Sequence, residues 1–254
     1  ELEAVVDPYR KRAKIETKIL VGTPFLEIIR EVLSGLHDLV VKMPENQHWA
    51  HRFFGSDDMH LLRKCPCPVW LIKPGAPDAY LSILAAVDVD DRYAPQEMET
   101  RRALNHEIIE RAIAIAVADS AELHIAHAWQ AVSESALRHT VFAQKTEKEV
   151  GIYVDQVRQH HNDRLEAFLL EVATNHAQAS LDYLEPKIHL VKGWARQEIP
   201  ALARNIGADL VVMGTVARTG IPGFIIGNTA ETILGHLDCS VLAVKPPGFV
   251  TPVK

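Results

Sequence analysis

The chain has 254 residues, 48% of them hydrophobic and 24% charged, which is the composition of a globular protein with room for a sizeable core. Its formal net charge of −6 argues against a general binder of nucleic acids or of anionic membranes. No apolar run approaches the roughly 20 residues of a transmembrane helix, and no signal peptide pattern opens the chain. Only three cysteines are present, which is too few for a disulfide framework. We therefore expect a cytoplasmic protein with no nucleic-acid partner and no membrane partner.

Residues 1–76 show strand patterns that alternate with helix patterns. Short apolar runs predict three strands, at 17–21, 36–41 and 69–72. Apolar residues at helical spacing predict one helix after Gly22 and a second helix from Gly55 to Cys65.

Residues 79–249 show the same alternation at greater length. Apolar runs predict strands at 81–88, 122–128, 187–191 and 210–213. A long helix separates the first two strands, and the next helix carries Leu165, Phe168 and Val172 on one face. Strands that alternate with helices of this length predict a parallel sheet with right-handed crossovers.

An internal repeat organises the chain. Residues 38–41 and 209–212 are both Asp-Leu-Val-Val, at an offset of 171 (209 − 38). Lys73-Pro and Lys245-Pro match at an offset of 172 (245 − 73), so one gap reconciles the two sets. We therefore predict two domains, a C-terminal part of a first domain at 1–76 and a complete second domain at 79–249. The first copy lacks its opening strand, helix and strand, and the chain does not begin with methionine, so we expect the native protein to extend at its N-terminus.

A glycine-bearing loop follows the strand at 210–213. Gly214 ends that strand, and Gly227 precedes Asn228 and Thr229, which open an amphipathic helix. Glycines let a backbone approach a ligand closely, and the N–H groups at a helix start attract anions. The segment is therefore a candidate phosphate site, although glycine loops that merely turn, and plain helix caps, have the same appearance.

The spacing of Gly214, Ala217 and Gly227, followed by Asn228-Thr229, resembles the G-x2-G-x9-G-[S/T] nucleotide motif of the universal stress protein superfamily. The surrounding sequence is most similar to the tandem, E-type members. Two departures stand out. The second motif glycine is Ala217, whose methyl group would crowd a nucleotide or forbid a positive φ, and Asn228 replaces the usual Ser or Thr.

The resemblance implies a fold and a ligand. The family fold is an α/β, Rossmann-like (adenine nucleotide alpha hydrolase-like) domain with a parallel five-stranded sheet in the order 3-2-1-4-5. In such sheets ligands bind at the carboxyl ends of the strands. The implied ligand is ATP or a related adenine nucleotide in the second domain. The implied binding residues are Asp88, Ile125, Gly214, Ala217, Gly227, Asn228 and Thr229. Arg218 is a further candidate, either as a charge-assisted donor to phosphate or as an exposed loop arginine without a ligand.

The resemblance also implies a bacterial stress-response protein without defined catalysis, in a family linked to DNA damage resistance. Three functions stay open: a nucleotide-binding sensor, an interaction or scaffold module that binds no nucleotide, and a weak nucleotide hydrolase with Asp88 as its base. Asp88 has the alternative role of capping the following turn. Either a homodimer or a pseudo-dimer of the two domains is expected.

Two further sites were considered. In the first copy, Met43 stands where the second copy has Gly214, so we expect no nucleotide there. His60, Cys65 and Cys67 could converge on zinc, but a small buried residue before a strand explains Cys67 better, and we expect no metal site.

Overall fold

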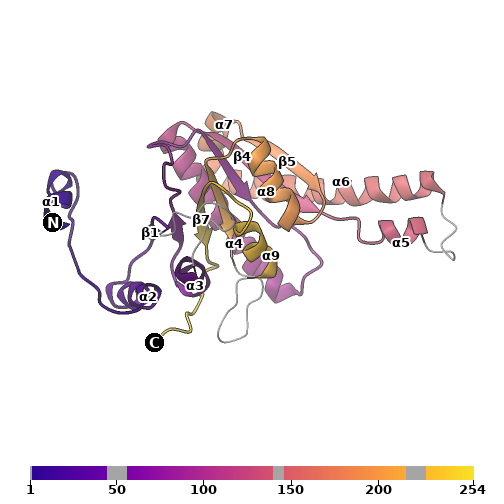
Figure 1. The fold of residues 1–254 in the computed structure, drawn as a ribbon. Coiled ribbons are helices and arrows are strands. Elements are labelled where there is room, and N and C mark those ends of the chain that lie inside the picture. Colours follow the sequence, from indigo (N-terminus) through magenta and orange to yellow (C-terminus); the bar gives the residue numbers. More distant parts are fainter. Residues whose placement is uncertain (1, 45–55, 140–145, 216–226) are drawn as a thin grey trace.

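The computed structural model describes residues 2–44, 56–139, 146–215 and 227–254. Within them, seven strands form one sheet in the order β1-β2-β7-β6-β3-β4-β5 (Figure 1). The strands are β1 (Val40–Lys42), β2 (Val69–Leu71), β3 (Ser82–Ala86), β4 (Glu122–Trp129), β5 (Lys187–Lys192), β6 (Leu210–Gly214) and β7 (Ser240–Val244). Every neighbouring pair is parallel except β2 and β7, which are antiparallel with Val69 opposite Ala243.

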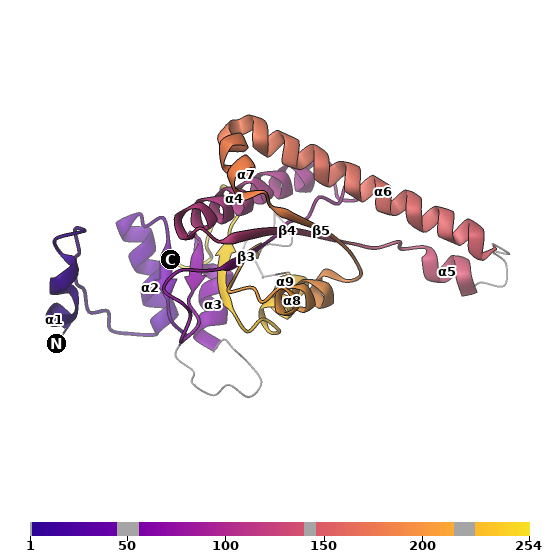
Figure 2. The ribbon, with the colours of Figure 1, turned by 90° about the horizontal axis from the view of Figure 1, so that it is seen from above.

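Helices cover both faces of this sheet (Figure 2). One face packs against α4 (Pro95–Asp119), α6 (Glu147–Val172) and α7 (Gln178–Leu184). The other packs against α2 (Pro24–Gly35), α3 (Ser56–Lys64), α8 (Ala195–Asn205) and α9 (Asn228–Leu234). The remaining elements of the described residues are two short helices, α1 (Leu2–Val6) and α5 (Glu134–His139), a 3-10 helix at Asp7–Tyr9 and a π-helical segment at Ala173–Ala177.

The alternation of side chains along the central strands divides them between two cores. In β6, Leu210 and Val212 belong to the core under α4 and α6, whereas Val211 and Met213 belong to the core under α8 and α9. Side chains of a strand point alternately to opposite faces, so a strand covered on both faces is apolar throughout. The predicted strands are continuous apolar runs because both of their faces are covered in this architecture.

The mostly parallel α/β fold is confirmed, but the predicted sheets differ from the structure in detail. We expected a five-stranded sheet in the order 3-2-1-4-5 for each domain. Instead, the strands of 1–76 and 79–249 form one seven-stranded sheet, to which the first segment contributes only β1 and β2. Within 79–249 the order is β5-β4-β3-β6-β7, which is the predicted 3-2-1-4-5 when the strands of this segment are numbered by themselves. The antiparallel pairing of β2 with β7 satisfies two strand edges that would otherwise be exposed.

The strand predicted at 17–21 is wrong. These residues have no regular secondary structure, and Ile19 and Val21 are exposed. A β-branched run forms a strand only where a neighbouring strand supplies hydrogen bonds and burial. No strand of the described residues lies beside this segment.

Two lysines connect the repeat copies where β2 meets β7. The Nζ of Lys245, just after β7, donates to the backbone oxygen of Leu62 in α3 and to Oγ1 of Thr215 at 2.6 Å. Its repeat counterpart, Lys73, donates to the backbone oxygen of Asp238. Burial lowers the pKa of Lys245 to about 7, against a weaker raising effect of Cys65. Lys245 thus joins the first copy to the residue that follows Gly214.

No helix among the described residues is both long enough and apolar enough to cross a membrane.

Candidate functional site

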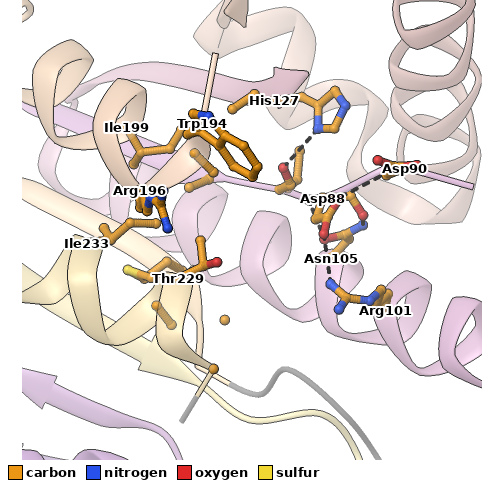
Figure 3. Close-up of a pocket in the computed structure, with 18 of the residues that line it drawn as sticks. Asp88, Asp90, Arg101, Asn105, His127, Trp194, Arg196, Ile199, Thr229 and Ile233 are labelled. Carbon is orange, nitrogen blue, oxygen red and sulfur yellow. Dashed lines mark hydrogen bonds and ion pairs between the residues drawn. The ribbon is translucent and has the colours of Figure 1, made fainter. Parts of the chain in front are cut away.

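A cavity of about 330 Å³ opens at the carboxyl ends of β3, β4 and β6 (Figure 3). Ala86 and Val87 come from the end of β3, His127 and Ala128 from β4, and Gly214 from β6. The chain leaves β3 toward β4 on one side and β6 lies on the other, so the sheet order reverses at this point. Such a switch point is where open parallel sheets bind ligands, because the loops diverge there.

Asp88, two residues beyond β3, is fixed in place through its backbone and its carboxylate. The backbone N–H of Asp88 donates to Oδ1 of Asn105 at 3.1 Å, and Nδ2 of Asn105 donates back to the backbone oxygen of Asp88 at 2.8 Å. Oδ2 of Asp88 accepts from the Tyr93 hydroxyl at 2.9 Å and from Nη1 of Arg101 at 2.7 Å. A buried asparagine on α4 and a charged partner therefore position this carboxylate at the cavity wall.

A second aspartate, Asp90, is also held by an arginine. Burial raises its pKa, but side-chain and backbone hydrogen bonds from Arg92 outweigh that effect and lower the pKa to about 2. Nε of Arg92 donates to both carboxylate oxygens of Asp90, at 2.8 and 2.9 Å. Asp90 is therefore ionised at any physiological pH, and it neutralises one of the arginines that line the cavity.

Two buried histidines form a hydrogen-bonded pair beside the cavity: His127 of β4 lines the cavity, and His161 lies behind it on α6. Nδ1 of His127 lies 3.3 Å from the Val87 oxygen, and its Nε2 lies 3.0 Å from Nδ1 of His161. Burial lowers the pKa of both rings, and each ring is neutral near pH 7. These two contacts fit one arrangement of protons, in which Nδ1–H of His127 donates to the backbone oxygen of Val87 and Nε2 of His127 accepts from Nδ1–H of His161.

The glycine side of the cavity faces Asp88. A Cβ on Gly214 would lie 2.5 Å from Cδ2 of Leu104, so a larger residue here would force the Leu104 side chain of α4 to move. Gly227 has φ of −59°, a value open to any residue, and its N–H donates to the Thr215 oxygen at 3.3 Å. Asn228 and Thr229 are exposed at the cavity rim. Packing against Leu104 therefore favours a glycine at position 214.

Trp194 and Arg196 are cavity residues that the sequence motif did not indicate. Trp194 directly follows Gly193, is the N-cap residue of α8 and is 55% exposed, a large value for so big an aromatic side chain. The guanidinium carbon of Arg196 lies 4.9 Å from the centre of the Trp194 ring. Both residues follow β5 in the chain. The sequence feature that could have indicated them is a tryptophan next to a glycine just after a predicted strand.

The structure brings together five of the eight predicted binding residues. Asp88, Gly214, Gly227, Asn228 and Thr229 all line the cavity. Ala217 and Arg218 fall outside the described residues. Ile125 is fully buried in the core under α4 and does not line the cavity. Since the cavity opens where the strands end, the β4 residues that reach it are His127 and Ala128, further along the strand than Ile125.

The residues considered for zinc do not gather into a metal site. The sulfurs of Cys65 and Cys67 are 3.6 Å apart, whereas the His60 ring stacks on Phe25 with centroids 4.6 Å apart. Across the described parts of the chain, no group of three or more His, Cys, Asp or Glu side chains is arranged to hold an ion. Met43, at the position equivalent to Gly214, is exposed.

The fold and cavity define an α/β protein with a candidate ligand site at the switch point of a mostly parallel sheet, and known proteins share this fold. The model of the universal stress protein family matches residues 102–245. Universal stress protein E of Escherichia coli K12 is 33% identical over 243 residues, which cover 94% of this chain and 71% of that protein. Universal stress protein E of Photorhabdus laumondii is 28% identical over 257 residues, covering 100% and 74%.

Solved structures agree with the sequence comparison. The crystal structure of a putative universal stress protein from Pseudomonas aeruginosa UCBPP-PA14 has a TM-score of 0.70 and 27% identity, covering 96% of this chain and 77% of that one. A functionally unknown protein from Pseudomonas aeruginosa PAO1 has a TM-score of 0.69 and 27% identity, covering 96% and 76%. The chain therefore belongs to the universal stress protein family, and its similarity to E-type members is confirmed.

Proposed function

We propose that this chain is a stress-response module that binds ATP or a related adenine nucleotide in the cavity at the carboxyl ends of β3, β4 and β6. One observation carries the proposal: Asp88, Gly214, Gly227, Asn228 and Thr229, which are far apart in sequence, line a single cavity. The ligand changes the surface around the cavity, so the module reports its presence without catalysing a reaction.

The cavity offers different surroundings to the two ends of a nucleotide. Met213, Ile199 and Ile233 supply an apolar wall, and the exposed ring of Trp194 supplies a flat surface. An adenine ring is flat and apolar on its faces, so it fits this part of the cavity. Oδ1 of Asp88 accepts from the Asp90 N–H at 3.2 Å, which caps the following turn, and Oδ2 accepts from Tyr93 and Arg101. A carboxylate has about four acceptor positions, so one remains for a ribose hydroxyl.

The phosphate end requires a cation that is not already neutralised. Arg92 and Arg101 line the cavity but bond to Asp90 and to Asp88 respectively. Arg196 stacks on Trp194, and no carboxylate of the described residues lies within ion-pair distance of it. With the Thr229 hydroxyl nearby on the lining, Arg196 is the residue best suited to bond a phosphate.

Calorimetric titration of ATP into the wild-type chain, Arg196→Ala and Arg158→Ala tests the proposal. Arg158 lies on the exposed side of α6 outside the cavity lining, so its loss makes the same charge change at a distance. Wild type and Arg158→Ala are expected to bind alike, and Arg196→Ala is expected to bind about fivefold more weakly, since an exposed charged hydrogen bond contributes about 1 kcal/mol.

The variant Ala217→Gly restores the motif glycine and separates the remaining outcomes. Binding by this variant alone would mean that one methyl group closes an otherwise competent site. If neither the wild type nor Ala217→Gly binds ATP, the proposal of nucleotide binding is overturned. This result would support the second candidate, an interaction module without a nucleotide, which the existing hydrogen bonds of the Asp88 carboxylate to Tyr93 and Arg101 favour.

Weak hydrolysis remains a third, less favoured function. Asp88 is its only candidate base, and Oδ2 of this residue already accepts hydrogen bonds from Arg101 and Tyr93, an arrangement that suits a fixed acceptor better than a proton carrier. Steady phosphate release that disappears in Asp88→Ala would be required to support it.

We also propose that the two copies form a pseudo-dimer within one chain. The antiparallel β2–β7 pairing and the crossing contacts of Lys73 and Lys245 support it. A monomeric mass in light scattering is the expected result, and a dimeric mass would favour the homodimer.

A further inference from the structure

Cys65 and Cys67 form a pair of thiols at the end of α3. They flank Pro66, between α3 and β2, and their sulfurs are 3.6 Å apart. The backbone N–H of Cys65 donates to the Leu61 oxygen at 2.9 Å, which anchors the first thiol to the last turn of the helix. Cys65 is fully buried, and Cys67 is 8% exposed. The two sulfurs are thus in contact, and both residues are buried, with Cys67 retaining the small exposed area of the pair.

The second repeat copy lacks this pair. Cys239 is the counterpart of Cys67 and likewise precedes the last strand of its copy, but Leu237 stands where the first copy has Cys65. Burial, with a smaller effect of Asp238, raises the pKa of Cys239 to about 12, so this thiol is unreactive. The chain therefore contains its own control, a buried cysteine in the same structural position without a second thiol.

The environments of the paired thiols assign them different roles. With Cys65 as the donor, one of the two directions open to this sulfur–sulfur contact, the hydrogen bond lowers the pKa of Cys67 despite its burial, and backbone N–H groups add to the lowering. The same hydrogen bond and burial raise the pKa of Cys65. The thiolate is the reactive form of cysteine. Cys67 is therefore the more reactive thiol as well as the more exposed one.

We propose that Cys65 and Cys67 are a site of reversible oxidation by hydrogen peroxide, at which the two thiols join in a disulfide while Cys239 stays reduced. The Cys67 sulfur attacks one peroxide oxygen, an S–O bond forms as the O–O bond breaks, and the departing hydroxide takes the thiol proton to become water. The Cys65 sulfur then attacks the Cys67 sulfur, and hydroxide leaves with the Cys65 proton as a second water. Two thiols and one peroxide give one disulfide and two waters.

The geometry suits this sequence of steps. Only Cys67 has to meet the oxidant, because Cys65 reacts from inside the protein with the neighbouring sulfur. The sulfurs must approach from 3.6 Å to the roughly 2.05 Å of a disulfide. A bridge over a single intervening residue is strained, and strained bridges are the easily reduced ones, so the product is expected to be reversible.

Peptide mass mapping of the full chain tests the proposal. The folded protein is treated with hydrogen peroxide, and its remaining thiols are then alkylated with iodoacetamide under denaturing conditions. The expected result is a peptide holding Cys65 and Cys67 that has lost two hydrogen atoms and carries no alkyl group, while Cys239 is fully alkylated. Treatment with dithiothreitol before alkylation restores both thiols.

Three variants assign the roles. Cys239→Ser is expected to form the disulfide as wild type does. Cys67→Ser leaves Cys65 reduced, and Cys65→Ser leaves Cys67 as a sulfenic acid that dimedone traps. Full alkylation of Cys65 and Cys67 after peroxide, oxidation of Cys239 to the same extent, or bridges between chains would each overturn the proposal. The wild-type result decides it even if a variant folds poorly.

Discussion

The two repeat copies place the same residues in different surroundings. Val41 in β1 and Val212 in β6 are equivalent in the repeat, yet Val41 is 54% exposed and Val212 is fully buried. The neighbouring strands explain the difference. β6 lies between β3 and β7, whereas β1 pairs with β2 alone. An apolar strand sequence therefore allows a strand to be buried, and the neighbouring strands determine whether it is.

The aspartates that begin these segments show the same contrast. Oδ2 of Asp209 accepts the backbone N–H groups of Leu81 at 2.8 Å and Ser82 at 3.1 Å, and so fixes the start of β3. Asp38, its repeat counterpart, is exposed, and β1 has no strand on that side among the described residues. Asp209 thus aligns β3 with β6, the two strands that form the cavity edge.

Replacing Asp209 gives the largest expected effect. Asp209→Ala removes two charge-assisted hydrogen bonds to strand backbone and is expected to lower the free energy of unfolding by about 3 kcal/mol. The matched change, Asp38→Ala, is expected to stay within about 0.5 kcal/mol. Urea denaturation of both variants measures the difference, and equal losses would show that the aspartates act through something other than β3.

Shortening the equivalent valines is expected to give the next largest effect. Val212→Ala leaves a cavity in the core under α4 and should cost about 2 kcal/mol. Val41→Ala removes surface that is already half exposed, so it should cost about 0.5 kcal/mol or less. The same denaturation measurement applies. A cost at Val41 as large as that at Val212 would mean that β1 is covered in solution.

The sequence predicted local features better than the pairing between distant strands. The alternation of strands and helices, the end of β6 at Gly214 and the end of β3 two residues before Asp88 follow from short-range patterns. The antiparallel β2–β7 pairing depends on which edges meet, and the failed strand at 17–21 depends on a missing neighbour. Neither property is encoded in a local pattern.

The site shows the same division. Asp88 and the glycine side of the cavity were identified because they follow strands directly. The family resemblance indicates Ile125, which lies in the middle of β4. The cavity is lined instead by residues at the ends of the strands. Trp194 and Arg196 belong to no motif, and their contribution depends on where α8 begins.

A smaller effect is expected from pH, and it arises in a part of the second copy that the first copy lacks. His127 and His161 lie on β4 and α6, which have no counterpart in 1–76. Burial lowers the pKa of His127, outweighing Asp88 and Asp90, and burial followed by His127 lowers that of His161. The folded state therefore holds these rings neutral. Above the ordinary histidine pKa of roughly 6.5, neither state binds protons at these rings and stability is fully present.

As pH falls through roughly 6.5, the unfolded chain takes up protons before the folded chain does, so the free energy of unfolding decreases until the folded pKa values are passed. His161→Gln is expected to flatten this slope, because it removes one of the shifted rings. His160→Gln, a change at the exposed neighbouring residue that faces Asp91, is expected to retain the slope. Comparing slopes from urea denaturation at several pH values removes any constant loss of stability. A slope unchanged by His161→Gln would place the pH dependence in other groups and show that the buried pair is not the sensitive element.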